Sequence, residues 1–312
     1  MRSKRVLAAL VLALAATGCA TSLSTLQIAR PVEPKHFQVS VGAGLYAPLG
    51  SVGSVVAQGV KQAEAATAAA KAGTPYSLSP DDQQDLLTAG IGLAVLTPGF
   101  GYEMSARTGL MNNLDVGLRY NVTSLRLDTK YRLLHAGNGA ERPLPGSMPV
   151  GGAPDAPLQS PPATRSYDLA IGLGVSRYFF SNPVFSVLEY VQLDDFSRWD
   201  FEVPLYLSAE FGEVFKLYAA PKYVYSRTTL DEKLVNYSEE ATNLTGFDVT
   251  LPTEVHSHFV GSTIGMAVGY RWVHLMLEMT GGYTFCDPVV FGQRRKLGGV
   301  TLQPAVALNF RF

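Results

Sequence analysis

The sequence contains few cysteines and few charged residues. Cysteine occurs twice, at Cys19 and Cys286, so a framework of several disulfides is excluded. Charged residues make up 16% of the 312 residues and hydrophobic residues 47%, which is an apolar composition for a soluble protein of this length. The formal net charge of −1 argues against nucleic acid as a partner, because that partner requires an excess of basic residues.

Beyond its first 18 residues the sequence also lacks a run of about 18 uninterrupted apolar residues, so no helical membrane span is expected. The apolar residues are instead dispersed at alternate positions. This period of two is typical of strands with one apolar and one polar face. The chain is long enough for one large domain, and we expect an all-β domain over residues 36–312.

The first 18 residues have the organisation of a secretory signal peptide. Arg2, Lys4 and Arg5 form a positive region, and the apolar run over residues 6–16 is too short to span a bilayer as a helix. Removing residues 1–18 takes away three basic residues and no acidic ones, so the formal net charge moves from −1 to −4.

The end of this segment resembles the lipobox of bacterial lipoproteins. The residues are Ala16-Thr17-Gly18-Cys19, with Ala16 where leucine is usual. The resemblance implies cleavage before Cys19, acylation of the chain at Cys19 with fatty acids such as palmitate, and a lipidated linker over residues 19–35. Ala20 stands where aspartate would mark retention in the inner membrane, so the resemblance also implies the lipoprotein-sorting machinery as a partner and the outer membrane as the destination. An ordinary secretory signal that leaves Cys19 free or removes it is the alternative.

Ten segments show the alternation of a half-polar strand. Several reach the roughly 9 to 11 residues that a strand tilted by about 45° needs to cross a bilayer. They cover residues 37–47, 99–109, 114–122, 125–133, 167–175, 201–211, 215–225, 260–270, 275–285 and 300–312.

The final segment, with the tight turns and alternating strands from Phe100 onward, resembles the broad class of bacterial outer-membrane β-barrel proteins. The resemblance implies an antiparallel transmembrane β-barrel surrounded by outer-membrane lipid, with its last strand ending in the periplasm. It also implies that Phe310 and Phe312 form the signal read by the barrel-insertion machinery. A closed barrel leaves no strand edge unpaired in the membrane.

The strand number is either ten or twelve. Residues 87–95 alternate like a strand, but Asp81 and Asp82 after Pro80 also suit the start of a helix. Residues 184–193 form either a strand or a helix begun by Asn182 and Pro183. Ten strands place the long proline-rich stretch 136–164 on the periplasmic side, where barrels keep their turns short, whereas twelve move it outside.

A helical insertion is expected in the first long loop. Residues 54–72 combine five alanines between 65 and 70 with lysine, glutamine and glutamate, and the helix should end at Gly73. It either lies over the mouth of the barrel or folds inward, so that residues 51–85 plug the lumen.

The polar faces of the strands carry charges of both signs, which point to the lumen because lipid cannot accept them. A salt-bridged interior and a water-filled lumen both remain open, although a pore selective for one ion sign would favour a one-sided ring. The lumen-facing candidates are Glu103, Arg107, Asp115, Arg119, Arg126, Asp128, Lys130, Arg132, Asp168, Glu202, Glu210, Lys216, Lys222, Arg271, Glu278 and Arg311.

No catalytic, cofactor or metal site is expected. His256 and His258 share one face of a strand, but Glu254 is the only acid near them and zinc sites need more ligands. Aromatic residues near strand ends suit a belt at the lipid headgroups. They include Tyr102, Tyr120, Tyr131, Tyr178, Phe179, Phe180, Tyr223, Tyr225, Tyr270 and Trp272.

The function expected from these observations is non-enzymatic. The protein is either a passive channel or transporter for small or hydrophobic solutes, or a structural component of the envelope. The main alternative is a soluble β-sheet lipoprotein that faces the periplasm and binds lipid or a protein partner, and a membrane-embedded hydrolase is less favoured. The two scaffolds differ at one set of residues, which would meet lipid in a barrel and form the core of a soluble domain. They are Leu118, Leu127, Ile171, Leu205, Val268 and Leu308.

Overall fold

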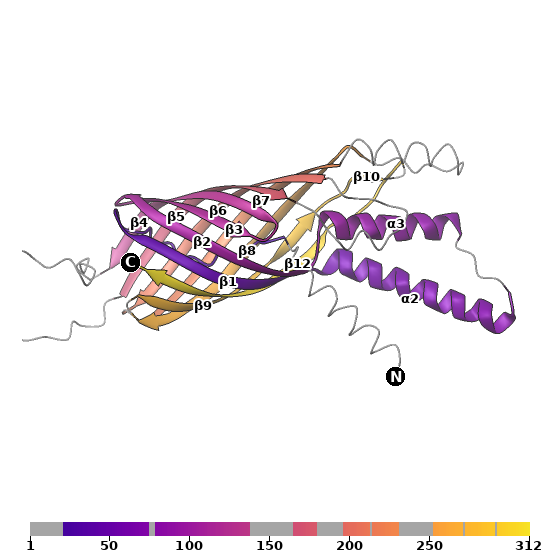
Figure 1. Cartoon of the computed structure of the whole chain (residues 1–312), viewed down its shortest axis with the longest axis horizontal. Helices are drawn as coiled ribbons and strands as arrows, with labels where there is room; N and C mark the ends of the chain where they lie inside the picture. Colours follow the sequence, from indigo (N-terminus) through magenta and orange to yellow (C-terminus); the bar gives the residue numbers. More distant parts are fainter. Residues whose placement is uncertain are drawn as a thin grey trace, which may run out of the picture.

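The structure is a computed structural model that describes residues 21–74, 79–137, 165–179, 196–212, 214–230, 252–270, 272–290 and 292–312. Ten antiparallel strands close into a barrel in the order β1-β12-β9-β8-β7-β6-β5-β4-β3-β2 (Figure 1). They are β1 Phe37–Pro48, β2 Gly99–Met111, β3 Leu114–Asn121, β4 Ser124–Gly137, β5 Arg165–Phe179, β6 Phe196–Phe211, β7 Phe215–Leu230, β8 Glu254–Tyr270, β9 Val273–Phe285 and β12 Gly299–Arg311.

The barrel closes through the pairing of its first and last strands. Val41 lies opposite Leu308 in the β1–β12 register. The N–H of Phe312 donates to the carbonyl of Phe37 at 2.9 Å, and the N–H of Phe37 donates back at 3.1 Å. The last strand of the sequence therefore leaves no free edge.

Along each strand the side chains alternate between the lumen and the outer surface, as the pleat requires. In β4, Leu125 and Leu127 are exposed while Arg126 and Asp128 are buried inside. The six residues that discriminate the two scaffolds, Leu118, Leu127, Ile171, Leu205, Val268 and Leu308, all face outward, with exposed fractions between 36% and 56%. A barrel with an apolar exterior and a polar interior is of the transmembrane type. The alternative in which these residues form a soluble core is wrong.

Most of the described aromatic residues named for the belt also face outward, and Tyr178 is the exception. Tyr102 and Tyr270 are 62% and 56% exposed, whereas Tyr178 is 3% exposed and lies under the guanidinium of Arg198 at 4.9 Å from its ring centroid. Tyr178 follows Ser176 by two positions and therefore shares its inward face. Phe180 lies outside the described residues.

The two ambiguous segments have different outcomes. Residues 87–95 belong to helix α3 (Pro80–Val95), so the strand interpretation is wrong there. Ser79 caps this helix by accepting a hydrogen bond from the N–H of Asp82, and Pro80 stands at its first turn. Residues 184–193 lie outside the described residues. Within the described ranges the closed barrel has ten strands.

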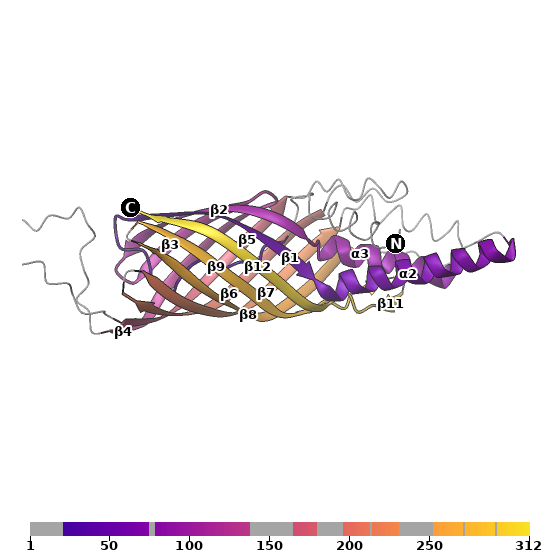
Figure 2. The same ribbon diagram turned by 90° about the horizontal axis from the view of Figure 1, so that it is seen from below.

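The predicted helical insertion between β1 and β2 is present. Helix α2 (Leu49–Ala72) ends at Gly73, whose φ of 65° suits glycine at a helix C-terminus. Both helices project away from one mouth of the barrel (Figures 1 and 2), and most of α2 is exposed. The described helices therefore do not plug the lumen. None of them is both long and apolar enough to cross a membrane.

The two mouths of the barrel differ. At the helical mouth lie α2, α3 and the small hairpin of β10 (Val289–Val290) and β11 (Gln293–Arg294). Val95 and Leu96 at the end of α3 pack there with Val255, Cys286 and Leu297. At the opposite mouth, called here the terminal mouth, β1 begins and β12 ends (Figure 2).

Candidate functional site: the lumen and the segment that fills it

Residues 21–36, called here the luminal segment, run through the inside of the barrel from the helical mouth to the terminal mouth. Thr21 accepts a hydrogen bond from Arg198, near the start of β6. At the other end the N–H of Val32 donates to Asp115, near the start of β3, at 2.9 Å. Lys35 then adopts a φ of 66°, and the chain enters β1.

This placement differs from the linker expected over residues 19–35, because residues 21–32 lie within the barrel and only residues 33–35 form the connection at its mouth. The sequence does carry a signal that fits the observed place: no charged residue occurs between Cys19 and Arg30. Leu23, Leu26 and Ile28 are each 4% exposed, and the residues between them are small or polar. An uncharged, mixed segment of this kind suits a narrow lumen lined by charges, although it has no strand or helix periodicity.

Acceptors on the barrel wall bind the backbone N–H groups of the luminal segment. Glu278 on β9 accepts from the N–H groups of Thr25 and Leu26, both at 2.7 Å. Gln303 on β12 accepts from the N–H of Leu23 at 2.5 Å. Buried backbone N–H groups need such partners, since an unpaired one is costly.

Donors on the wall bind the backbone carbonyls of the same residues. The guanidinium of Arg119 donates to the carbonyls of Ser24 and Thr25, both at 2.6 Å. The ammonium of Lys130 donates to the carbonyl of Ile28 at 2.8 Å, and Lys222 donates to that of Leu23. Three buried cations are thus partly neutralised by peptide dipoles of the luminal segment.

Side chains of the luminal segment also make polar contacts with the wall. The hydroxyl of Ser24 donates to Glu103 at 2.6 Å, and the amide of Gln27 donates to the hydroxyl of Tyr206 at 2.8 Å. Leu26 and Ile28 pack in one apolar cluster with wall residues that include Tyr218, Met276 and Ala307.

A second group of charges pairs within the wall. Arg107 on β2 bridges Asp115, at 2.6 Å, and Asp128, and all three side chains are at most 4% exposed. Arg126 pairs with Glu202, and Lys130 lies 3.3 Å from Asp115. Because removing ions from water is costly, such pairs persist only when each charge has several partners.

Most of the charged residues predicted for the lumen are buried inside the barrel. Arg132 and Arg311 are only partly buried, and Arg271 lies outside the described residues. The buried ones are Glu103, Arg107, Asp115, Arg119, Arg126, Asp128, Lys130, Asp168, Glu202, Glu210, Lys216, Lys222 and Glu278.

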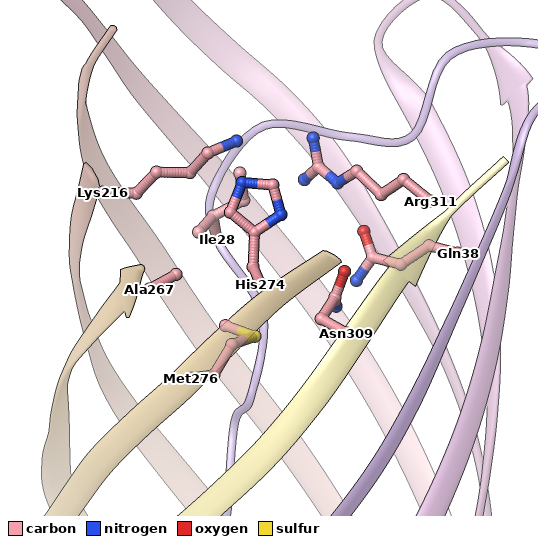
Figure 3. A pocket seen from close by; sticks show the side chains of 8 residues that line it. All are labelled: Ile28, Gln38, Lys216, Ala267, His274, Met276, Asn309 and Arg311. Atoms are coloured by element: carbon pink, nitrogen blue, oxygen red, sulfur yellow. The ribbon is translucent and has the colours of Figure 1, made fainter. Parts of the chain in front are cut away.

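A small cavity lies beside the luminal segment. A pocket at the terminal mouth has a cavity volume of about 10 Å³, which suits roughly one water molecule. Figure 3 shows the side chains around it, with Lys216 and Arg311 approaching from opposite walls and Ile28 of the luminal segment between them. A larger cavity of about 210 Å³ lies outside the barrel, between α2, α3 and residues 295–297.

The histidine pair lies on the outer surface and not in the lumen. His256 hydrogen-bonds Tyr225 at 2.8 Å, and His258 hydrogen-bonds Tyr223 at 2.7 Å. The ring of His256 stacks on that of Tyr225 with centroids 6.0 Å apart. Among the described residues no three His, Cys, Asp or Glu side chains come together as a metal site would require.

No protein-family model and no curated protein matches the chain. Solved structures with a similar arrangement include neisserial surface protein A, at 10% identity and a TM-score of 0.33 over 89% of this chain and 96% of that one. The attachment invasion locus protein of Yersinia pestis matches at 8% identity and 0.30, over 89% and 99%. The outer membrane protease OmpT of Escherichia coli matches at 11% identity and 0.32, over 93% and 100%. At these values no functional residue carries over to this chain.

Proposed function

We propose that this protein is an outer-membrane β-barrel lipoprotein, anchored through lipid on Cys19, that serves as a sealed structural component of the envelope. The observation that carries the proposal is the luminal segment, which passes from one mouth of the barrel to the other. An open porin needs a continuous water-filled path at this place.

Two features support the membrane location. Exposed apolar side chains surround the barrel, including Leu127, Val203 and Leu308, and lipid is the solvent that suits such a surface. The barrel is also closed, so its backbone hydrogen bonds are satisfied without water. The signal peptide and the lipobox-like residues around Cys19 agree with export to the outer membrane.

The contacts of the luminal segment support the sealed state. They come from wall residues spread around the barrel, including Glu103 on β2, Lys130 on β4, Lys222 on β7, Glu278 on β9 and Gln303 on β12. Passive transport would require this segment to leave the lumen and would expose many buried charges. A structural role requires no open path through the lumen.

Conductance in planar bilayers tests this proposal. The full mature chain should insert without producing a stable current, while a known porin in the same membrane serves as the positive control. Steady ohmic conductance from the intact chain would refute the sealed barrel. Separation of the outer membrane on a density gradient, with labelled palmitate followed in the same fractions, tests the location and the anchor.

The proposal assigns no enzymatic activity and no cofactor to the protein. Its test is an ester-hydrolysis assay on phospholipid vesicles that contain the purified chain. Hydrolysis that disappears when a single histidine such as His256 is replaced by alanine would overturn the assignment.

A further inference from the structure

The wall of the lumen contacts the main chain of the luminal segment at many positions, in addition to the side chains of Ser22, Ser24 and Thr25. Side chains of the wall accept hydrogen bonds from the N–H groups of residues 23, 25, 26 and 32. They donate to the carbonyls of residues 23, 24, 25, 28 and 30. Every residue except proline carries this donor and acceptor pair, so the main-chain contacts do not depend on one particular sequence.

The side chains of the luminal segment show which sizes and charges the lumen accepts. Ser24 and Thr25 are small hydroxyl residues, and Thr25 meets the hydroxyl of Thr263 at 3.0 Å. The apolar Leu26 and Ile28 fit among small wall residues such as Ala267 and Ala305. An uncharged strand with small or medium side chains fits the space that residues 23–28 occupy.

The luminal segment is joined covalently to the barrel at one end. Pro34 and the exposed Lys35 connect the segment to β1. Among the described residues, the only strand-like pairing between the luminal segment and the barrel is the single bridge between Pro34 and Gly109. Withdrawal of the segment therefore breaks its hydrogen bonds to the side chains of the wall but leaves the hydrogen bonds between the described strands of the barrel intact.

From this geometry we propose that the lumen is a binding site for an extended polypeptide strand, held by its backbone, and that the luminal segment is an exchangeable occupant of this site. The class of ligand is a peptide with an uncharged stretch of small or medium side chains, as residues 20–29 are in this chain. The inference rests on the proposed sealed barrel and names what seals it.

The test begins with the full mature chain and separates the luminal segment from β1 without removing it. A recognition sequence for a specific protease is inserted between Pro34 and Lys35, where the chain is exposed near the terminal mouth. After cleavage in detergent, a fluorescent peptide with the sequence of residues 20–34 is added. Fluorescence anisotropy and co-migration with the folded barrel measure its uptake, which should displace the cleaved segment.

Two further peptides distinguish recognition of the backbone from recognition of the sequence. A peptide in which residues 20–29 are scrambled and residues 30–34 are kept should bind within a factor of about ten, since it presents the same backbone groups. A peptide that is N-methylated at the positions of Thr25 and Leu26 loses both donors to Glu278 and should bind at least about 100-fold more weakly. Equal binding of the methylated peptide would refute recognition through the backbone.

A matched pair of variants on one strand completes the experiment. Glu278→Gln should speed up exchange because the wall loses a charged acceptor, whereas Leu277→Ala, on the outward face next to it, should leave exchange unchanged. The proposal would be overturned by a cleaved segment that never exchanges. It would also be overturned by a barrel that no longer migrates as a folded band on detergent gels once the segment has left. If exchange fails and the intact chain shows no conductance in bilayers, only the exchange of the segment is refuted. Conductance by the intact chain would refute the sealed barrel itself.

Discussion

Glu278 accepts a hydrogen bond from the backbone N–H of Thr25 at 2.7 Å, although the two residues lie 253 positions apart in the sequence. The same carboxylate accepts from the N–H of Leu26 at 2.7 Å and from the hydroxyl of Tyr218 at 3.0 Å. Three donors thus surround one buried carboxylate in the middle of the lumen. This arrangement ties the luminal segment to β9 and β7 and makes Glu278 the most informative position for mutation.

Glu278→Gln should lower the free energy of unfolding by about 2 kcal/mol, because one acceptor oxygen becomes an amide donor that faces a backbone N–H. Urea unfolding of the protein in lipid vesicles, followed by tryptophan fluorescence, measures this change. Glu254→Gln, which affects an exposed pair with Arg227, serves as the control and should change stability far less. Equal effects of the two variants would argue against the role of Glu278.

Asp115→Asn should be more damaging, with a loss of about 3 to 5 kcal/mol. Asp115 lies between Arg107 and Lys130 and also accepts from the N–H of Val32, so its neutralisation leaves two buried cations short of a partner. The temperature at which the folded band disappears on detergent gels reports the loss. Arg227→Ala, at an exposed ion pair, should shift this temperature far less. A stability loss below about 1 kcal/mol for Asp115→Asn would show that the buried network is not stabilising.

Leu205→Arg tests the outer surface of the barrel. If Leu205 faces lipid, an arginine there should cost about 2 to 4 kcal/mol near the middle of the bilayer. Folding into vesicles, titrated with urea, gives the value. The same change at Val56, which is exposed on α2 outside the barrel, should have little effect. A neutral Leu205→Arg variant would contradict a lipid-facing surface.

The contact between α2 and α3 should depend on pH at its extremes only. A hydrogen bond from Lys61, supported by Ser79 and Gln62, lowers the pKa of Asp82 from its ordinary 3.8 to about 2, and the same contact raises the pKa of Lys61 above 10.5. The lowered pKa of the acid means that the pair is fully stabilising above about pH 4 and is lost as the pH falls through about 2. The raised pKa of the base means that the pair is fully stabilising below about pH 10.5 and is lost as the pH rises through the raised pKa of Lys61.

Distances between spin labels on the exposed faces of α2 and α3 would follow this contact. The distances should stay constant from about pH 4 to pH 10, and their distribution should broaden below that window. Asp82→Asn provides the control, because its distances should lose the acid transition. A transition near pH 6 in the unmodified chain would contradict the assignment to this pair.

The two cysteines should behave differently toward reagents. Cys19→Ala should abolish the incorporation of labelled palmitate if Cys19 is the acylation site. Burial raises the pKa of the Cys286 thiol to about 12, so this thiol stays protonated at neutral pH and should resist maleimide in the folded barrel. Mass spectrometry measures the palmitate on Cys19. After brief labelling it also measures the maleimide on Cys286, with a urea-unfolded sample as the reference. Rapid labelling of Cys286 in the folded Cys19→Ala variant would contradict its buried position.

Much of the barrel could be predicted from the sequence because the relevant pattern is local. The pleat sends consecutive side chains to opposite faces, so the neighbouring residues Arg126 and Leu127 indicate a polar inner face and an apolar outer face even before the neighbouring strands are known. The end of α2 at Gly73 is local in the same way, since glycine there adopts the φ of 65° that closes a helix.

Other features depended on contacts between distant residues. Residues 87–95 alternate like a strand, yet they form a helix that is capped by Ser79 and packs at its end against Val255 and Leu297. Packing and the cap outweigh a weak periodicity in such a short segment.

The sequence by itself determined which residues face lipid and which face the lumen, because the alternation of a strand is written into neighbouring positions. Only the tertiary structure decided what fills the lumen. Residues 21–36 carry no periodicity, and their place is set by hydrogen bonds to Arg119, Lys130 and Glu278, which lie about 95 to 253 positions away in the chain. A backbone that is bound by such distant side chains leaves no local pattern in its own sequence, since the same N–H and carbonyl groups occur at almost every residue.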